Sequence, residues 1–341
     1  MTTAQHKIGS GFGATSTAAE VLAGIDLTGR LVIVTGGYSG LGLETTRALT
    51  AAGAHVVVPA RRRATAEEAL RGFENVEIDE LDLGDLDSVR AFAERFLASE
   101  RGIDIFIGSA GIMASPETRV GPGWEAQFAT NHLGHFALVN RLWPAFTPGA
   151  RVVSVSSRGH HFGPVRFDDL NFEQGYDKWL AYGQAKTANV LFAVQLDKLA
   201  RDRGVRAFAL HPGRIMTDLV RYLDREELVA AGMLDSSGQV TGDVKTPEQG
   251  AATQVWAATS PQLDGLGGVF CEDCDIAEVS EGDAPGARDA HLDRQGTRLE
   301  ASGHHGLAHA LGIGHGLARA RGHACPRRYT AETASTLAPS T

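Results

Sequence analysis

Residues 35–42 read Thr-Gly-Gly-Tyr-Ser-Gly-Leu-Gly and separate the apolar run Leu31–Val34 from a segment with helical spacing, Leu41–Ala52. Glycine lets the chain turn tightly and lets a ligand approach the backbone closely. The N-terminus of the following helix adds N–H groups and a positive dipole. The loop therefore predicts a pyrophosphate site, although its G-x-x-x-G-x-G spacing also fits a plain glycine-rich strand-to-helix turn.

The same alternation of short apolar runs and amphipathic segments continues on both sides of this loop. Further runs include Val56–Val58, Ile103–Ile107, Val152–Val155 and Val205–Leu210, and helical spacing appears between them, most extensively over Trp124–Trp143. Continuous apolar strands alternating with helices indicate a parallel sheet covered on both faces. We therefore predict an α/β fold with a doubly wound parallel sheet of the Rossmann type.

Composition sets the domain limits and excludes several classes of protein. Residues 24–288 are expected to form one domain, flanked by a flexible tail over 1–23 and a disordered tail rich in Gly, Ala, His and Arg over 289–341. A net charge of −9 argues against a nucleic-acid-binding protein. Three cysteines, the lack of a secretory signal and the lack of a membrane-length apolar run predict a cytoplasmic protein.

Two arginines follow the second predicted strand, where many dinucleotide sites carry an acidic residue. The segment reads Pro59-Ala60-Arg61-Arg62-Arg63, so Ala60 stands where an Asp or Glu would hold a ribose 2′-hydroxyl. Guanidinium groups suit a phosphate, which favours NADP(H) over NAD(H), while a solvated start to a helix is the alternative. Asp82, at the end of the third strand, could accept from an adenine amino group or cap a turn.

Tyr182 and Lys186 lie four residues apart, and helical geometry would place them one turn apart on one face. A nearby ammonium stabilises a phenolate, so Lys186 is expected to lower the pKa of Tyr182. Upstream, the segment Val152–Ser157 brings hydroxyl groups to the carboxyl end of a strand, where open α/β sheets bind ligands.

From about Asp26 to about Ile276 the chain resembles the short-chain dehydrogenase/reductase family. The resemblance rests on TGGYSGLG at 35–42, LDL at 81–83, SAG at 109–111, NHLGHF from Asn131, VSVSS at 153–157, YGQAK at 182–186, and Pro212-Gly213 with Thr217. The NHLGHF stretch and the long gap before Tyr182 are similar to the branch of retinol-dehydrogenase-like and WW-domain-oxidoreductase-like members.

The resemblance implies a set of catalytic roles. Tyr182 would transfer the proton, Lys186 would hold the nicotinamide ribose, and Asn131 would hold a water linking Lys186 to solvent. Ser157 would orient the substrate oxygen, with Ser156 as the near alternative. The implied cofactor residues are Gly36, Ser39, Gly40, Leu41, Gly42, Arg61, Arg62, Asp82, Leu83, Ala110, Gly111, Tyr182, Lys186, Pro212, Gly213 and Thr217.

One motif departs from the family. Its N-N-A-G segment appears here as Gly108-Ser109-Ala110-Gly111, so both asparagines that help to join the central strands are missing. No metal site is predicted: Cys271-x-x-Cys274 lacks a second ligand pair, and His132, His135 and the His160-His161 pair are expected to pack or to border the cleft.

The predicted function is NADP(H)-dependent oxidoreduction of a lipophilic carbonyl or alcohol. The segment between Pro212 and Pro247 is expected to form a substrate lid, with the apolar side chains Ile215, Met216, Leu219, Tyr222, Leu228 and Met233, joined by Phe162, Trp179 and Leu180. A dinucleotide-binding sensor or scaffold, or a C=C reductase, are the alternatives. The expected partners are this substrate and, in a homodimer or homotetramer, further copies of the chain.

Overall fold

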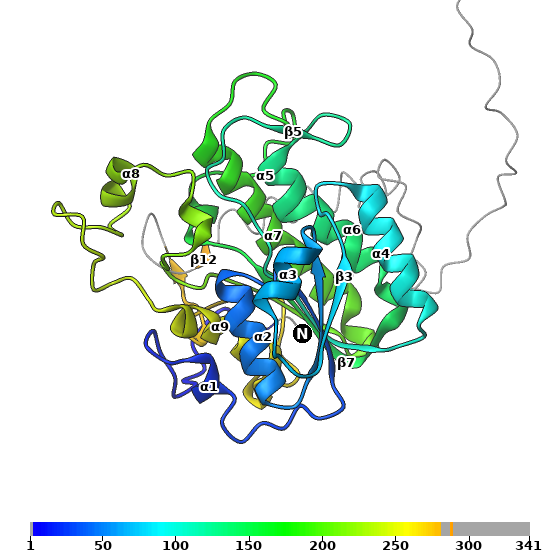
Figure 1. The fold of residues 1–341 in the computed structure, drawn as a ribbon. Helices are drawn as coiled ribbons and strands as arrows, with labels where there is room; N and C mark the ends of the chain where they lie inside the picture. Colours follow the sequence, from blue (N-terminus) through cyan, green and yellow to red (C-terminus); the bar gives the residue numbers. More distant parts are fainter. Residues whose placement is uncertain (1–2, 281–286, 289–341) are drawn as a thin grey trace, which may run out of the picture.

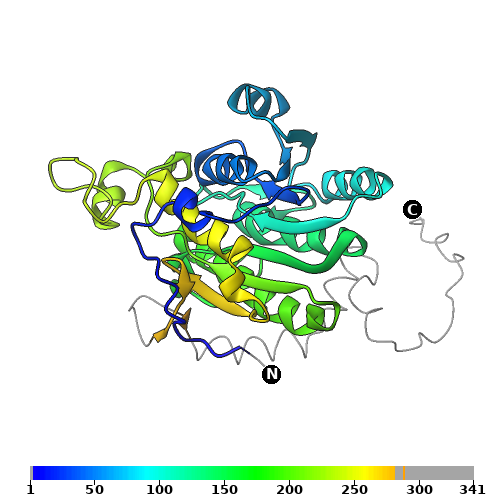
Figure 2. The same ribbon diagram turned by 90° about the horizontal axis from the view of Figure 1, so that it is seen from below.

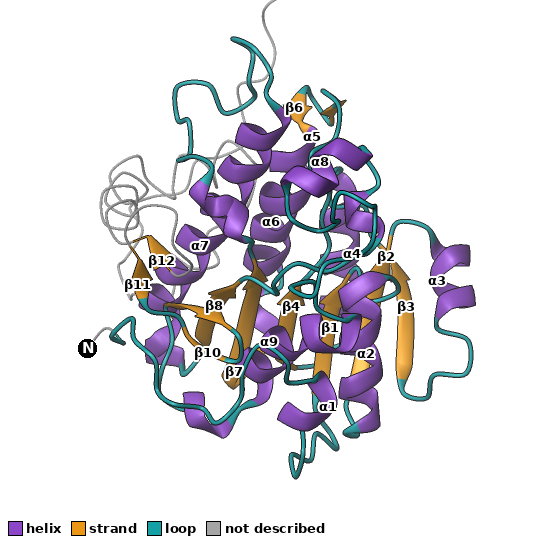
Figure 3. Cartoon of the chain, turned by 90° about the vertical axis from the view of Figure 1, so that its left-hand side faces the viewer, coloured by secondary structure: helices purple, strands orange, loops and turns teal. Residues whose placement is uncertain are grey.

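A computed structural model describes residues 3–280 and 287–288 of the chain. Its centre is one sheet with the strand order β10-β9-β8-β7-β4-β1-β2-β3, and Figure 3 shows these strands side by side. All neighbours in this sheet pair in parallel except β9 and β10. The strands are β1 (Leu31–Thr35), β2 (His55–Ala60), β3 (Val76–Glu80), β4 (Ile103–Gly108), β7 (Phe146–Val155), β8 (Arg206–Leu210), β9 (Val269–Glu272) and β10 (Asp275–Ile276). The predicted doubly wound parallel sheet is confirmed.

Alternate residues of the strands form two separate hydrophobic cores. Ile33, Val57 and Phe106 belong to the core on one face, which helices α4 (Leu86–Ala98), α6 (Gly134–Arg141) and α7 (Lys178–Ala200) cover. Val32 and Val34 belong to the core on the other face, beneath α1 (Ala18–Val21), α2 (Gly40–Ala51) and α9 (Pro247–Thr259). Because successive strand residues point to opposite faces, an uninterrupted apolar strand serves both layers.

The remaining described elements lie around this body. Helix α3 (Arg63–Ala69) follows β2, and α8 (Arg225–Ala230) belongs to a segment that projects from the sheet in Figures 1 and 2. Short strands form the pairs β5 (Arg119–Val120) with β6 (Trp124–Glu125) and β11 (Val279–Ser280) with β12 (Ala287–Arg288). Single turns of helix are η2 (Trp143–Ala145), η3 (Arg158–His161), η4 (Arg201–Arg203), η5 (Asp218–Val220) and η6 (Pro261–Leu263).

The long helix expected over Trp124–Trp143 is interrupted. After β6, the chain forms a short α5 (Ala126–Phe128), a π-helical turn η1 (Ala129–Leu133) and then α6. A π-turn inserts an extra residue and commonly occurs at functional sites. Here it contains Asn131, whose side chain is fully buried and pairs with the backbone of another segment.

The flexible tail expected over residues 1–23 differs from the structure, which docks residues 5–10 on the β9–β10 hairpin. Gln5 Nε2 donates to the carbonyls of Phe270 and Ala277 at 2.8 and 2.6 Å. The Asp275 carboxylate accepts from the backbone N–H groups of Ile8 and Gly9 at 2.9 and 3.0 Å. These partners lie more than 260 positions away in the sequence, so no local sequence pattern could predict the contacts. Figure 2 shows the N-terminal segment running along this hairpin. The predicted tail over 289–341 lies outside the described residues.

Helix α7 is 23 residues long. Within residues 3–280, neither it nor any other helix combines the length and the apolar character that crossing a membrane requires.

Candidate active site

One cavity of about 1210 Å³ lies at the carboxyl ends of β1, β2, β4, β7 and β8. Carboxyl strand ends are the usual ligand side of an open α/β sheet. The cavity brings together most of the predicted site, namely Gly36, Ser39, Leu41, Gly42, Arg61, Arg62, Asp82, Leu83, Ala110, Gly111, Ser157, Tyr182, Lys186, Pro212, Gly213 and Thr217. Gly40 and Asn131 do not line it.

The glycine loop is packed so closely that two of its glycines have no room for a side chain. At Gly42 a Cβ would overlap the carbonyl oxygen of Gly36. Gly36 itself has φ +69, and a Cβ there would lie 2.9 Å from Ala110 Cα. The residue before helix α2, Ser39, makes no capping hydrogen bond with its side chain. The first N–H groups of α2 therefore remain available to a ligand at the cavity.

Arg61, Arg62 and Asp82 border the cavity beside the glycine loop. Asp82 Oδ1 accepts from the Gly84 N–H at 2.8 Å, so this residue does cap a turn. Among the described residues, the side chains of Arg61 and Arg62 form no ion pair or hydrogen bond with the protein, whereas the adjacent Arg63 pairs with Glu67 at 2.8 Å. Two guanidinium groups are thus free for a ligand at this end of the cavity.

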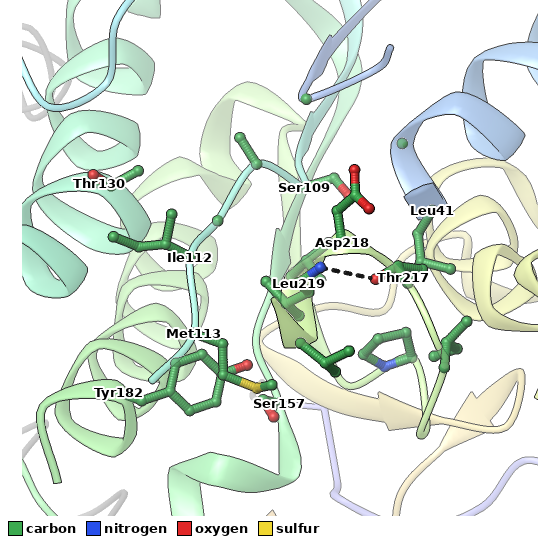
Figure 4. A pocket seen from close by; sticks show the side chains of 18 of the residues that line it. Leu41, Ser109, Ile112, Met113, Thr130, Ser157, Tyr182, Thr217, Asp218 and Leu219 are labelled. Atoms are coloured by element: carbon green, nitrogen blue, oxygen red, sulfur yellow. Dashed lines mark hydrogen bonds between the residues drawn. The ribbon is translucent and has the colours of Figure 1, made fainter. Parts of the chain in front are cut away.

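Tyr182 and Ser157 meet at the opposite end of the cavity, and Figure 4 shows their side chains next to one another with Met113. The Ser157 hydroxyl oxygen accepts from the Gly159 N–H at 3.0 Å, which leaves its proton free to donate. Ser156 differs, because its hydroxyl already donates to the carbonyl of Lys186 at 2.7 Å. Of the two serines, only Ser157 has its hydroxyl beside Tyr182.

Burial governs the protonation of the tyrosine and the lysine. Burial raises the pKa of Tyr182 to about 12, although its hydrogen bond with Ser157 acts in the opposite direction. Burial also lowers the pKa of Lys186 to about 8. Lys186 Nζ lies 5.6 Å from the centre of the Tyr182 ring and donates to the Val155 carbonyl at 3.0 Å. The pKa of Tyr182 therefore lies above its usual value, where the sequence pattern predicted a lowering; burial is the main cause, and Lys186 is not among the groups that shift it.

Asn131 acts on the wall of the cavity through the backbone of Ile112. Its Oδ1 accepts from the Ile112 N–H at 2.8 Å and its Nδ2 donates to the Ile112 carbonyl at 2.9 Å. This two-way pairing fixes the segment 109–113, and Ile112 and Met113 from that segment line the cavity. The side chain of Asn131 thus positions the wall between the glycine loop and Tyr182.

His135 occupies the space left by the missing asparagine at Gly108. A Cβ on Gly108 would lie 3.1 Å from His135 Cδ2. His135 Nδ1 lies 3.0 Å from the Asn131 carbonyl, and its Nε2 lies 2.8 Å from Thr35 Oγ1. Thr35 Oγ1 also accepts from the Ala110 N–H at 3.1 Å. These hydrogen bonds connect three elements: β1, the segment that follows β4, and α6. They join the central strands at the place where the two asparagines of the family motif are absent.

The substrate lid expected between Pro212 and Pro247 does reach the cavity. Of the predicted apolar residues, Ile215, Leu219, Tyr222, Met233, Phe162 and Trp179 line it, whereas Met216, Leu228 and Leu180 do not. The Leu219 N–H donates to Thr217 Oγ1 at 3.3 Å, as Figure 4 shows, so Thr217 caps the turn η5. The cavity is also lined by Arg158, Arg214 and Arg221, which belong to no recognised motif and so were not indicated by the sequence.

The histidines and cysteines for which the sequence predicted no metal site are mostly packed inside the protein. His132 packs among Phe128, Phe136 and Phe192, and His160 lies 4.8 Å from the Phe270 ring, centre to centre. Cys271 and Cys274 are free, buried thiols whose pKa values burial raises. Over the described part of the chain, no group of three or more His, Cys, Asp or Glu residues is arranged to hold a metal ion.

Comparison with known proteins gives concordant matches in sequence and in fold. A family profile described as short chain dehydrogenase matches residues 30–228. A protein from Streptomyces antibioticus named probable oxidoreductase is 46% identical over 78% of this chain and 93% of its own length. Retinol dehydrogenase 11 of Mus musculus is 36% identical over 75% of this chain and 81% of its own length.

A solved structure of an uncharacterised protein from Mycobacterium paratuberculosis has the same fold. It superposes with a TM-score of 0.66 at 33% identity, covering 87% of this chain and 97% of that protein. Together with the retinol dehydrogenase match, these similarities confirm the resemblance inferred from the ordered motifs and from the NHLGHF stretch.

Proposed function

The chain belongs to the short-chain dehydrogenase/reductase family, and on that premise we propose that it is an NADP(H)-dependent oxidoreductase acting on a lipophilic carbonyl or alcohol. One observation carries the proposal. Tyr182, Ser157 and Lys186 converge at one end of a cavity whose other end is formed by the glycine loop and by Arg61 and Arg62. A cofactor and a substrate can therefore meet in the same cavity.

The residues at the glycine end fit a dinucleotide phosphate. Gly36 and Gly42 pack against neighbouring backbone with no room for a Cβ, which holds the turn tight, and the N-terminus of α2 is uncapped by Ser39. Backbone N–H groups at a helix start suit a pyrophosphate. Arg61 and Arg62, free of protein partners in the described residues, would hold the 2′-phosphate of NADP(H). When bound, the nicotinamide supplies or accepts the hydride.

Tyr182 would act as the proton donor or acceptor at the substrate oxygen. Because burial raises its pKa to about 12, the side chain is protonated at neutral pH and is ready to donate during carbonyl reduction. Ser157, oriented by the Gly159 N–H, would donate a hydrogen bond to the same oxygen and stabilise its developing charge. Lys186 Nζ lies 5.6 Å from the centre of the Tyr182 ring and would hold the nicotinamide ribose, while Asn131 keeps the adjoining wall in place.

The lining near Tyr182 supports a lipophilic substrate. Ile112, Met113, Phe162, Trp179 and Leu219 present apolar surface there. Phe162 remains 50% exposed, so the cavity keeps an apolar edge open to solvent. Apolar walls with a few placed polar groups are typical of sites for small lipophilic ligands.

The test is a screen of lipophilic ketones and aldehydes with NADPH and NADH, following the loss of cofactor absorbance. We expect turnover, and we expect Tyr182→Phe to lower kcat by about a hundredfold to ten-thousandfold because it removes the transferable proton but keeps the ring. NADPH affinity, measured by fluorescence titration, should stay within a few-fold of the parent protein.

Two outcomes would contradict the proposal. Substantial activity in Tyr182→Phe would mean that another residue supplies the proton. Binding of NADPH without turnover of any carbonyl or alcohol would favour a dinucleotide-binding sensor or scaffold. Reduction of a C=C bond in the substrate would favour a C=C reductase.

A further inference from the structure

The side chains that line the cavity carry an excess of positive charge, whereas the protein as a whole is negatively charged. The chain has a net charge of −9, yet six basic side chains and only two acidic ones, Asp82 and Asp218, line the cavity. The basic residues are Arg61, Arg62, Arg158, Lys186, Arg214 and Arg221. A local excess of one sign in a cleft attracts ligands of the other sign.

The proposed function accounts for only three of these six groups. Arg61 and Arg62 follow β2 and are assigned to the cofactor, and Lys186 lies beside Tyr182. The other three arginines come from segments around the substrate end. Arg158 directly follows Ser157 in η3, while Arg214 and Arg221 belong to the lid segment that begins after Gly213.

Of these three arginines, Arg158 and Arg214 lack any side-chain partner among the described residues. Across residues 3–280, neither forms an ion pair or a side-chain hydrogen bond. Other arginines are paired: Arg101 contacts Glu77 at 2.6 Å and Arg151 contacts Asp264 at 2.7 Å. Arg221 is more restrained, because its Nη1 donates to the Asp218 carbonyl at 2.8 Å and its guanidinium lies over the Tyr222 ring.

The Arg214 guanidinium packs against another part of the lid rather than extending into solvent. A Cβ on Gly232 would lie 3.3 Å from Arg214 Nη1, so the guanidinium sits against the turn after α8. The neighbours of Gly232 in that turn, Ala231 and Met233, line the cavity. Both Arg158 and Arg214 are only partly exposed. A partly buried guanidinium without a counter-charge is unfavourable unless a ligand supplies one.

Resting on the proposed function, we infer that the substrate is a lipophilic oxo or hydroxy compound that carries an anionic group, a carboxylate or a similar acid. The apolar walls formed by Phe162, Trp179 and Leu219 would hold its body. Arg158 and Arg214 would bind its acid, and the reacting oxygen would lie at Ser157 and Tyr182. Guanidinium groups bind carboxylates through short, charge-assisted hydrogen bonds, which gives selectivity over a neutral analogue.

The experiment compares a medium-chain aliphatic oxo acid with its methyl ester, which differ in charge but hardly in shape. With NADPH, the full-length protein should show a kcat/KM about ten- to a hundredfold higher for the acid. Arg214→Met and Arg158→Met should each lower this acid-to-ester ratio by about tenfold. Arg225→Met is the matched control, because Arg225 lies on the same lid but outside the cavity, and it should keep the ratio of the parent protein.

Two results would overturn the inference while leaving the proposed function intact. One is equal kcat/KM for the acid and the ester. The other is a weaker affinity for NADPH in Arg158→Met or Arg214→Met with an unchanged ratio, which would assign these arginines to the cofactor.

A binding measurement separates this inference from the proposed function. Calorimetric titration of the full-length protein with decanoate and with decanol needs no turnover, and decanoate should bind about tenfold more tightly in the parent protein but not in the double variant of Arg158 and Arg214. Equal affinity for the two would overturn the inference, even if no carbonyl were reduced.

Discussion

The two ends of the cavity are built in different ways. At the cofactor end, the glycine loop excludes side chains and offers the backbone of α2, so the geometry depends on the packing of Gly36 and Gly42. At the substrate end, η3 and the lid contribute side chains. The two ends of the lid pair through the isolated bridge between Ile215 and Lys245, and Lys245 Nζ contacts Asp273 beyond the lid at 2.6 Å. Backbone geometry tolerates little change, whereas a side-chain surface can alter its ligand one residue at a time.

The connection between the ends is a third kind of structure. The segment 109–113 runs from the end of β4 past Tyr182, and Asn131 and Thr35 fix it by bonds to Ile112 and Ala110. All three bonds reach the backbone of the segment. The difference between the two ends therefore makes a prediction about stability and ligand binding. Substitutions that disturb backbone packing at the cofactor end should have large effects on both, and changes of charge should have smaller ones.

The largest effect in this comparison should come from Gly42→Ala. Its Cβ would overlap the Gly36 carbonyl, so the loop must move, and we expect a loss of about 3 kcal/mol in the free energy of unfolding together with weaker NADPH binding. Gly242→Ala in the lid is the control, because no atom lies within 4 Å of a Cβ there. Denaturant unfolding and fluorescence titration measure both quantities. Similar results for the two variants would contradict the contrast between the ends.

The next effect is a pH dependence of stability that His135 should introduce at the cofactor end. Burial lowers the pKa of His135 to about 4 from 6.5, so the folded state resists protonation while the unfolded state does not. Stability from this group is present above pH 6.5 and is lost as the pH falls towards 4. Between pH 7.5 and pH 5, the parent protein should lose about 2 kcal/mol more than His135→Gln.

The matched measurement is denaturant unfolding of the parent protein and of His135→Gln at both pH values. The pKa of Glu125 is raised by burial and acts in the opposite direction, but it is common to both proteins and cancels in the difference. An identical pH dependence would mean that His135 is not kept neutral by its position between Thr35 and Asn131.

The smallest effect concerns the two arginines proposed to select the cofactor. Replacing Arg61 and Arg62 by Ala, together with Ala60→Asp, should lower NADPH affinity and raise NADH affinity by about tenfold each, which corresponds to about 1.4 kcal/mol. Arg63→Ala is the control, because Arg63 pairs with Glu67 outside the cavity. Equal affinity of the parent protein for the two cofactors would remove the basis for the assignment of NADP(H).

The sequence alone predicted the doubly wound sheet, the glycine loop and the alignment of Tyr182 with Lys186. Each of these depends on short-range patterns. Apolar strands such as Leu31–Val34 serve both sheet faces, and residues four apart on a helix must share a face. The same argument failed for 124–143, because helical spacing cannot show the π-turn at Asn131, whose side chain pairs with Ile112 from a distant segment.

The tertiary structure decided which side chains meet and what their environment does to them. It docked residues 5–10 on the hairpin that contains Asp275, and it placed His135 in the space beside Gly108. It raised the pKa of Tyr182, where the sequence pattern predicted a lowering, because desolvation depends on every neighbour and not on Lys186 alone. It also brought Arg158 and Arg214 to one cavity from segments more than fifty residues apart. Local sequence determines secondary structure, but burial and long-range contacts determine the charge and the chemistry of the site.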